Sequence, residues 1–408
     1  MLFVAAMAVS ATAQISNTLS PYSQFGLGVL SDQSQGFNRG MGGLTYGLRD
    51  SKNVNMQNPA SYSAIDSLTM IFDMGLSGQM TNFQDGQKKI NAKTGDFDYA
   101  VALFRVMPKM GVSFGVVPYS NIGYTFYNQT GDTNLSLVNI YSGDGGFSQA
   151  YVGVGYEVLP HLSIGANLSY FWGKYEKNIV STPSETDAST LTRSYSTSVS
   201  SYKLDFGAQW QKQLNKDNLL TVGAVVGIGH KLHGDAVVDT LRVTNAFSLP
   251  FSIGVGASLL HKNSWTVGVD YSLQKWGGID YPMLNSSTKQ YVNTSGVLKD
   301  RHKLTVGADW LPSPNPLTRN FFKRIHYRAG ISYATPYYNI GSHEGPTEIG
   351  VSAGFGIPII NSWNTRSVVN ISAQWVHSSA KDLITENTFR INIGLTFNER
   401  WFAKWKVD

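Results

Sequence analysis

The side chains that most often carry chemistry in proteins are few in this sequence, and their spacing matches no familiar reactive pattern. The chain has no cysteine, so it can form neither a disulfide nor a thiolate metal site. His230 and His233 are three residues apart, which in a strand places them on opposite faces. The sequence contains neither an H-E-x-x-H motif nor a G-x-S-x-G turn. We therefore expect a protein that is not an enzyme and that needs no metal or cofactor.

Charged residues on otherwise small and polar strand faces are the remaining candidates for a site. They are Asp205, Asp270, Asp309, Arg328 and Arg390, which we expect to face the interior of the fold as lumen-facing residues. The two arginines could bind a carboxylate headgroup. Alternatively, they pair with the three aspartates and brace a segment that fills the fold. We favour the second interpretation, because buried charges usually have partners.

The segments that carry these residues alternate between apolar and small or polar side chains. In residues 247–259 every odd position is apolar, and the even positions are Ser, Pro or Gly. The same period of two returns in residues 349–359 and 389–397. This pattern predicts β-strands with one apolar face.

Composition and aromatic placement indicate where that apolar face points. Only 14% of the residues are charged, against 41 glycines and 12% aromatic residues. Aromatic residues fall near the ends of the apolar faces, with Trp210, Trp265, Trp310, Tyr327 and Phe397 at one end and Trp172 and Trp375 at the other. Two aromatic girdles around an apolar band are typical of a transmembrane barrel. The net charge of +5 is spread along the chain and predicts no nucleic-acid partner.

We expect an all-β fold, a 14-stranded antiparallel transmembrane β-barrel, because an open sheet edge in lipid would leave backbone groups unpaired. The predicted strands are residues 68–82, 96–107, 109–127, 147–159, 161–178, 195–213, 218–232, 243–260, 264–277, 300–312, 324–336, 347–359, 366–379 and 387–398.

Short and long connections should alternate between these strands, with the long ones outside the cell. The predicted long connections are residues 82–96, 128–146, 178–194, 278–298 and 337–346. One short connection, residues 311–323, contains three prolines and is expected to form an ordered knob.

The chain divides into four predicted parts. Residues 1–13 resemble an export signal peptide, with an apolar stretch followed by Ala11-Thr12-Ala13. Residues 14–67 do not alternate cleanly and are expected to form an N-terminal plug, because fourteen strands enclose a lumen too wide for side chains alone. Residues 68–398 form the barrel, and residues 399–408 a periplasmic C-terminal tail.

Within the plug, glycines and a proline turn are the informative features. Gly40, Gly42 and Gly43 follow Arg39 and would allow the backbone to approach the inner wall closely. Asn58, Pro59 and Ala60 come just before the first strand, where Pro59 fixes φ and Asn58 can hydrogen-bond its own backbone.

This order of features resembles the FadL-type outer-membrane transporters of hydrophobic compounds. The resemblance rests on residues 39–43, on Asn58-Pro59-Ala60 and on the fourteen alternating segments, including residues 327–333 and the closing strand 390–397. The chain departs from that family's pattern after Phe397, where an aromatic and basic tail continues.

The resemblance implies a channel in the bacterial outer membrane of a Gram-negative cell, which takes up hydrophobic small molecules such as long-chain fatty acids. The expected partners are membrane lipid and a hydrophobic ligand. The alternative is a non-transporting FadL-like barrel that serves as a structural or docking subunit of an outer-membrane secretion or assembly complex. The tail, residues 401–406 above all, favours this alternative and would contact an outer-membrane protein.

Overall fold

The computed structural model describes residues 19–132, 135–183, 189–285, 290–315, 318–359 and 367–400. The predicted signal peptide, residues 1–13, and residues 401–408 of the predicted tail lie outside this range. No helix within the described part of the chain is long and apolar enough to cross a membrane.

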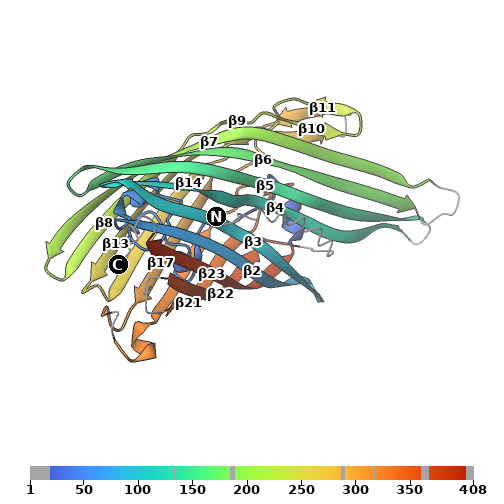
Figure 1. Ribbon diagram of the computed structural model, residues 1–408. Coiled ribbons are helices and arrows are strands. Elements are labelled where there is room, and N and C mark those ends of the chain that lie inside the picture. Colours follow the sequence, from blue (N-terminus) through green and yellow to red (C-terminus); the bar gives the residue numbers. More distant parts are fainter. Residues whose placement is uncertain are drawn as a thin grey trace, which may run out of the picture.

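Fourteen antiparallel strands close into a barrel, which confirms the predicted fold class (Figure 1). The strands are β2 (Thr69–Asp85), β3 (Lys88–Met107), β4 (Met110–Asp132), β5 (Leu135–Leu159), β6 (Leu162–Pro183), β7 (Leu191–Asn215), β8 (Asn218–Gly227), β13 (Phe251–His261), β14 (Trp265–Lys275), β17 (Arg301–Trp310), β18 (His326–Ala334), β21 (Thr347–Ile359), β22 (Ser367–Ser379) and β23 (Thr385–Arg400). The last strand closes on the first, from Thr69 opposite Arg400 to Gln84 opposite Thr385. Glu399 and Arg400 therefore belong to the wall, and the barrel ends two residues later than expected.

The apolar face of the alternation points outward. Ile253 and Ile391 are 41% and 46% exposed on the outer surface, although both are strongly apolar. Near the short turns, the rings of Trp265, Trp310 and Tyr327 stand side by side, with centroids 5.3 and 5.5 Å apart. Such a surface is stable in lipid and unfavourable in water.

The short turns depend on left-handed backbone conformations. Two residues, Pro108 and Lys109, connect β3 to β4, and Lys109 has φ of +67°. Pro160 and His161 connect β5 to β6 in the same way, with φ of +71° at His161. Residues 311–325 form a larger turn that contains the 3-10 helix η3 (Phe321–Arg324).

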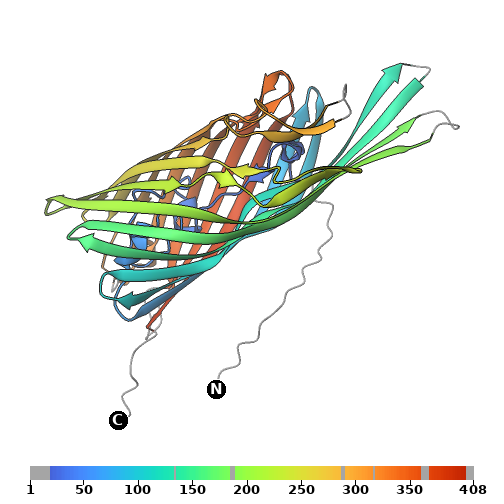
Figure 2. The same ribbon diagram turned by 90° about the horizontal axis from the view of Figure 1, so that it is seen from above.

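Three of the predicted long connections are wrong, because the strands continue through them as hairpins. Only residues 86–87 separate β2 from β3, and β4 remains paired with β5 up to Asp132 opposite Leu135. β6 and β7 pair as far as Ser181 opposite Leu191. Ladder hydrogen bonds need no apolar face, so these polar residues extend the sheet beyond the membrane. The β4–β5 and β6–β7 hairpins consequently project far past the rest of the barrel (Figures 1 and 2).

The other two long connections are folded loops. Residues 278–298 contain the hairpin of β15 (Tyr281–Asn285) and β16 (Gln290–Thr294). Residues 337–346 contain the two-residue strands β19 (Asn339–Ile340) and β20 (His343–Glu344).

The predicted strand 243–260 begins later than expected. Phe247 and Leu249 are only 2% and 3% exposed and pack inside the barrel mouth, whereas the lipid-facing alternation starts at Phe251. Pro250 lacks an N–H and separates the two parts. Between β8 and β13 the chain forms β9 (His230–Lys231), β10 (Gly234–Val238), β11 (Leu241–Val243) and β12 (Ser248–Leu249). β10 pairs with the outer half of β7.

Candidate functional site

Residues 19–65, here called the lumenal segment, lie inside the barrel (Figures 1 and 2). The segment contains η1 (Pro21–Gln24), β1 (Val29–Leu30), α1 (Gly36–Arg39) and η2 (Pro59–Ala64). The first part contacts the external loops, and η2 packs on β5, β6 and β7 near their short turns. The chain thus runs along the lumen from the external mouth to the periplasmic end.

The turn into η2 has the local chemistry expected from its sequence. The Asn58 side chain accepts a hydrogen bond of 3.2 Å from the Ala60 N–H, and Pro59 occupies the first helical position. Asn58 and Ala60 are fully buried. Pro59 also lies against Gly165 of β6, where a β-carbon would come within 2.4 Å of the Pro59 carbonyl carbon. Glycine is required on the wall here because the backbones are in direct contact.

A buried ion pair fixes α1 to the wall. Arg39 is 2% exposed, and its Nη1 lies 2.6 Å from Oδ2 of Asp98 on β3. The same nitrogen donates to Oδ1 of Asn392 at 2.8 Å. Tyr99 also connects α1 to the wall. Its hydroxyl accepts a hydrogen bond from the Gly36 N–H at 2.6 Å and donates one to Asp73 at 3.0 Å.

A second charged residue of the lumenal segment, Asp32, lies close to Arg39, whose Nη2 donates to the Asp32 carbonyl at 3.3 Å. Burial acts to raise the pKa of Asp32, but the positive charges of Arg39 and Lys303 outweigh burial and hold the pKa below its usual range. The carboxylate also accepts from the Ser34 N–H at 3.0 Å. This end of the segment is therefore bound by charge as well as by shape.

The glycines of the segment approach the inner wall closely. A β-carbon on Gly40 would lie 3.2 Å from the backbone of Gly354, and Gly42 has φ of +72° beside Ile331. Gly43 has φ of +85°, with no atom nearer than 3.6 Å to its β-carbon position. Gly40 and Gly42 thus serve close packing, whereas Gly43 serves the backbone conformation.

The five predicted lumen-facing charges lie inside the barrel, but they do not form one site. Asp270 is 4% exposed and accepts from the backbone N–H groups of Thr45 and Tyr46, at 2.5 and 2.9 Å. Arg328 lies 3.4 Å from Asp309 and donates to Asn370 at 2.6 Å. These three residues brace the lumenal segment and the wall around it.

The other two predicted charges, Arg390 and Asp205, have partners that the sequence did not suggest. Arg390 donates two hydrogen bonds to Oε1 of Gln79, at 2.9 and 2.6 Å, and no aspartate among the described residues lies within ion-pair distance of it. Asp205 pairs with Lys203, two residues away on β7. The expectation that both arginines pair with aspartates is therefore wrong for Arg390.

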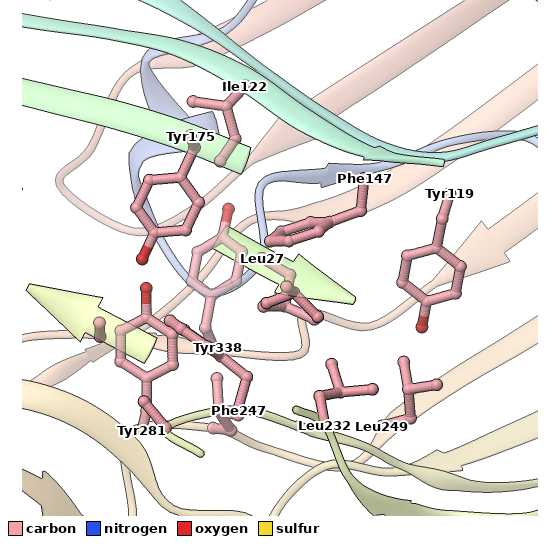
Figure 3. Close-up of a cluster of buried hydrophobic side chains, with 14 of the residues drawn as sticks. Leu27, Tyr119, Ile122, Phe147, Tyr175, Leu232, Phe247, Leu249, Tyr281 and Tyr338 are labelled. Carbon is pink, nitrogen blue, oxygen red and sulfur yellow. The ribbon is translucent and has the colours of Figure 1, made fainter. Parts of the chain in front are cut away.

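Aromatic side chains close the external mouth over the lumenal segment (Figure 3). Leu27 lies at the centre of this mouth cluster, 2% exposed. The buried aromatic members of the cluster are Tyr22, Tyr119, Tyr124, Phe147, Phe171, Tyr175, Phe247, Trp276, Tyr281, Tyr291, Tyr337 and Tyr338. They come from strands and loops far apart in sequence, which is why no local motif could have revealed them.

Polar groups of the mouth cluster bind backbone carbonyls of the segment. Tyr281 donates to the Gly26 carbonyl at 2.8 Å, and Tyr337 donates to that of Gly28. Lys177 donates to the Gln24 carbonyl at 2.6 Å, with its ammonium 4.4 Å from the centre of the Tyr175 ring. The mouth therefore recognises the shape of the segment through its backbone.

The space left between the lumenal segment and the wall is small, and its lining mixes polar and apolar groups. The cavities between the segment and the wall measure about 180, 120 and 90 Å³. Charged residues of β17, β21 and β23 line the largest of the three, among them Arg301, Lys303, Glu348 and Arg390. Binding pockets for drug-sized ligands usually measure about 300–1,000 Å³ and are mostly apolar.

The structure brings together one serine–histidine pair that sequence spacing did not show. Ser201 Oγ on β7 lies 3.4 Å from His230 Nε2, and the His230 ring stacks on Tyr202. His230 Nδ1 is buried without a hydrogen-bond partner among the described residues, so no acid orients the ring for catalysis. No group of three or more potential metal ligands occurs within the described ranges.

Solved structures with the same architecture include hydrocarbon channels and toluene transporters. The chain is similar to the CymD monoaromatic hydrocarbon channel, with 15% identity and a TM-score of 0.55, covering 91% of this chain and 98% of that one. The toluene transporters TodX of P. putida and TbuX of Ralstonia pickettii give 14% and 13% identity, each with a TM-score of 0.57. The matches cover 90% and 88% of this chain, and 98% and 96% of theirs. At such identities the likeness establishes the fold.

The closed wall of fourteen strands and these likenesses define a FadL-like β-barrel. The family model of BamG matches residues 1–240 and 229–408, so the chain belongs to the BamG family. No curated protein matches the chain.

Proposed function

We propose that this BamG-family barrel is a structural or docking subunit of an outer-membrane secretion or assembly complex. The observation that carries the proposal is the occupied lumen. The mouth cluster holds the outer end of the lumenal segment, and the buried ion pair and Asp270 hold its middle. A barrel closed in this way serves better as a rigid scaffold than as a passage.

Two further features support a docking role. The β4–β5 and β6–β7 hairpins project beyond the barrel and offer a broad external surface (Figure 2). On it, Tyr127 and Ile140 are opposite each other, 76% and 42% exposed. Exposed apolar side chains on a polar extension are typical of protein contacts. The predicted contact through the C-terminal tail would add a second surface at the periplasmic end.

Uptake of hydrophobic compounds is the second candidate function. The fold likeness to hydrocarbon channels favours it. A separation between β3 and β4, which pair only from Ala100 opposite Val116 to Met107 opposite Met110, favours it too, because it interrupts the wall. A small cavity of about 30 Å³ reaches this separation, between Phe97 on β3 and Asn121 on β4. A compound as large as a long-chain fatty acid would require the lumenal segment to move before it could pass along the lumen, because the three cavities beside that segment are too small to hold it.

Purification from outer membranes distinguishes the two functions. We would insert an affinity tag after Ser189, extract the full chain in mild detergent, and analyse both protein and extractable small molecules. A stoichiometric membrane-protein partner, without a bound hydrophobic compound, supports docking. A chain that purifies alone with a hydrophobic compound in its lumen would overturn the docking proposal and support transport.

A further inference from the structure

The outer half of β3 has an open hydrogen-bonding edge. On one side β3 pairs with β2 over most of its length, from Met70 opposite Phe104 to Asp85 opposite Lys88. On the other side its pairing with β4 covers only Ala100 opposite Val116 to Met107 opposite Met110. In the part of the chain that the structure describes, no strand pairs with this second side of residues 88–98.

Irregularities in both strands produce the separation. The ladder between β2 and β3 shifts between Gly75 and Leu76, which leaves Asp98 outside the register and directed toward Arg39. On β4 the ladder with β5 shifts between Pro118 and Ser120, so that Tyr119 forms the bulge. Pro118 has no N–H to donate across the gap. Because Asp98 and Tyr119 are held by buried contacts, the separation is part of the folded wall.

The lumenal segment occupies the β4 side of the gap and leaves the β3 side open. Val29 and Leu30 pair with Asn121 and Ser120 of β4. The N–H groups of Leu19 and Ser31 donate to the carbonyls of Gly123 and Tyr119, at 2.8 and 2.9 Å. None of these bonds reaches β3, where alternate N–H and C=O groups face the gap.

Charge at this edge selects what can pair with it. Lys88, Lys89 and Lys93 are all exposed, and Lys93 lies opposite Met80 at the level of Phe389 and Trp375. Lysines on an edge repel a second lysine-rich edge, which disfavours pairing between two copies of this chain. Ile90 and Phe97, 67% and 44% exposed, supply apolar contacts to an incoming chain.

We infer that residues 88–97 of β3 are a docking edge for an extended, acidic segment of a partner protein, which adds as a strand in the gap. The inference rests on the proposed docking function and names the kind of contact that it uses. Backbone hydrogen bonds supply the affinity of strand addition, and side chains supply its specificity. The three lysines would meet acidic side chains of the partner at the external end of the edge.

Short peptides test the edge on the purified full chain, without knowledge of the partner. The probes are a ten-residue peptide of alternating Thr and Glu, the same peptide with Lys in place of Glu, and a backbone N-methylated Thr–Glu peptide. Hydrogen exchange of residues 88–97 is followed by mass spectrometry. The Thr–Glu peptide should slow exchange of the amides that face the gap by about tenfold, because each of them gains a hydrogen bond. The other two peptides should have no effect.

Charge reversal provides the matched comparison. The variant Lys88→Glu/Lys89→Glu/Lys93→Glu should respond to the Thr–Lys peptide instead of the Thr–Glu peptide. The control Lys174→Glu/Lys231→Glu changes two exposed lysines on other strands and should keep the original preference. Equal protection by both charged peptides, protection by the N-methylated peptide, or no protection by any peptide would overturn the inference.

Co-purification separates failure of the edge from failure of the docking function. If a stoichiometric partner is recovered with the unchanged chain and is lost with the triple reversal, both proposals hold. A partner that is retained by the triple reversal rejects the edge and leaves the docking function in place. Absence of any partner rejects the docking function, and the peptide experiment then judges the edge by itself.

Discussion

Arg39 of the lumenal segment and Asp98 of β3 form an ion pair of 2.6 Å inside the barrel, at the point where β3 and β4 separate. One contact therefore connects two features, the chain that fills the lumen and the interruption of the wall. The bulge at Asp98 directs its carboxylate inward, and the same bulge changes the path of the strand beyond it.

Breaking this pair should release the lumenal segment. Arg39→Leu leaves Asp98 buried without its cation, and such a change typically costs about 3–5 kcal/mol. We expect faster proteolysis within residues 19–65 and a lower urea midpoint in detergent. Lys109→Ala is the control, because Lys109 pairs with Glu157 while 52% exposed and should matter little. Equal effects of the two substitutions would show that the buried pair does not hold the segment.

The wall glycine Gly330 should be sensitive to the addition of a single methyl group. A β-carbon at Gly330 would lie 2.2 Å from the carbonyl carbon of Met41, so Gly330→Ala must displace the segment. Overpacking of this kind typically costs about 1–3 kcal/mol. Gly78→Ala is the matched control, because nothing lies within 4 Å of its β-carbon position. Protease sensitivity of the segment should rise only for Gly330→Ala, and a segment unaffected by both would contradict the close contact.

Neighbouring residues on β13 test which face meets lipid. Ile253 is 41% exposed on the outer surface, whereas Ser252 lines a lumenal cavity of about 120 Å³. Ile253→Arg should destabilise the barrel by roughly 2–4 kcal/mol, as for arginine at the middle of a bilayer. Ser252→Arg should be milder, and heat-modifiability on semi-native gels measures both. Equal damage would count against the assignment of the two faces.

Single cysteines test the orientation of the barrel, because the natural chain has none. Asp85, Ser189, Lys216 and Lys262 are all exposed, so labelling depends only on the side of the membrane. A membrane-impermeant maleimide should label Asp85→Cys and Ser189→Cys on intact cells. Lys216→Cys and Lys262→Cys should react only after the outer membrane is opened. The reverse pattern would invert the barrel.

The strands of the wall can be predicted from sequence where each residue's own contact with lipid or lumen decides whether it is apolar. Alternation is imposed residue by residue by lipid on one side, so all fourteen strands were predicted at their approximate positions. Where lipid ends, the constraint ends too, and the paired polar hairpins around Asn82 and Asn91 resembled loops. Phe247 and Leu249 alternate like Phe251, and only their burial in the mouth cluster shows that they face inward.

For the lumen, the sequence predicts that a segment packs inside, but not which residues contact each other. Glycines beside Arg39 indicated close packing, but the partners of that arginine, Asp98 and Asn392, lie 59 and 353 residues away in sequence. Asp309 and Arg328 are opposite each other in register on β17 and β18, so their pairing follows from strand order. Arg390 bonds instead to Gln79, which lies opposite it on β2, and a search for charges alone overlooks such an amide.

Deletion of residues 20–45 is the most direct test of what the lumenal segment does. The deletion removes η1, β1 and α1, the ion pair, and the backbone carbonyls to which the mouth cluster donates. It leaves η2 and every barrel strand. Because the wall strands pair with one another, the barrel should still insert and remain heat-modifiable. Conductance in planar bilayers should rise, since the deleted residues fill the upper lumen.

The same deletion separates the two functions. For a docking subunit, loss of the β1 contact with β4 should alter the gap beside β3 and reduce recovery of the partner, without a selective change in hydrophobic uptake. For a transporter, selective uptake of a hydrophobic solute should be lost while no partner is affected. Gly78→Ala, which touches nothing in the lumen, should behave like the unchanged chain in all three measurements. Unchanged conductance after the deletion would mean that residues 20–45 do not obstruct the barrel, and the rigid-scaffold argument would lose its basis.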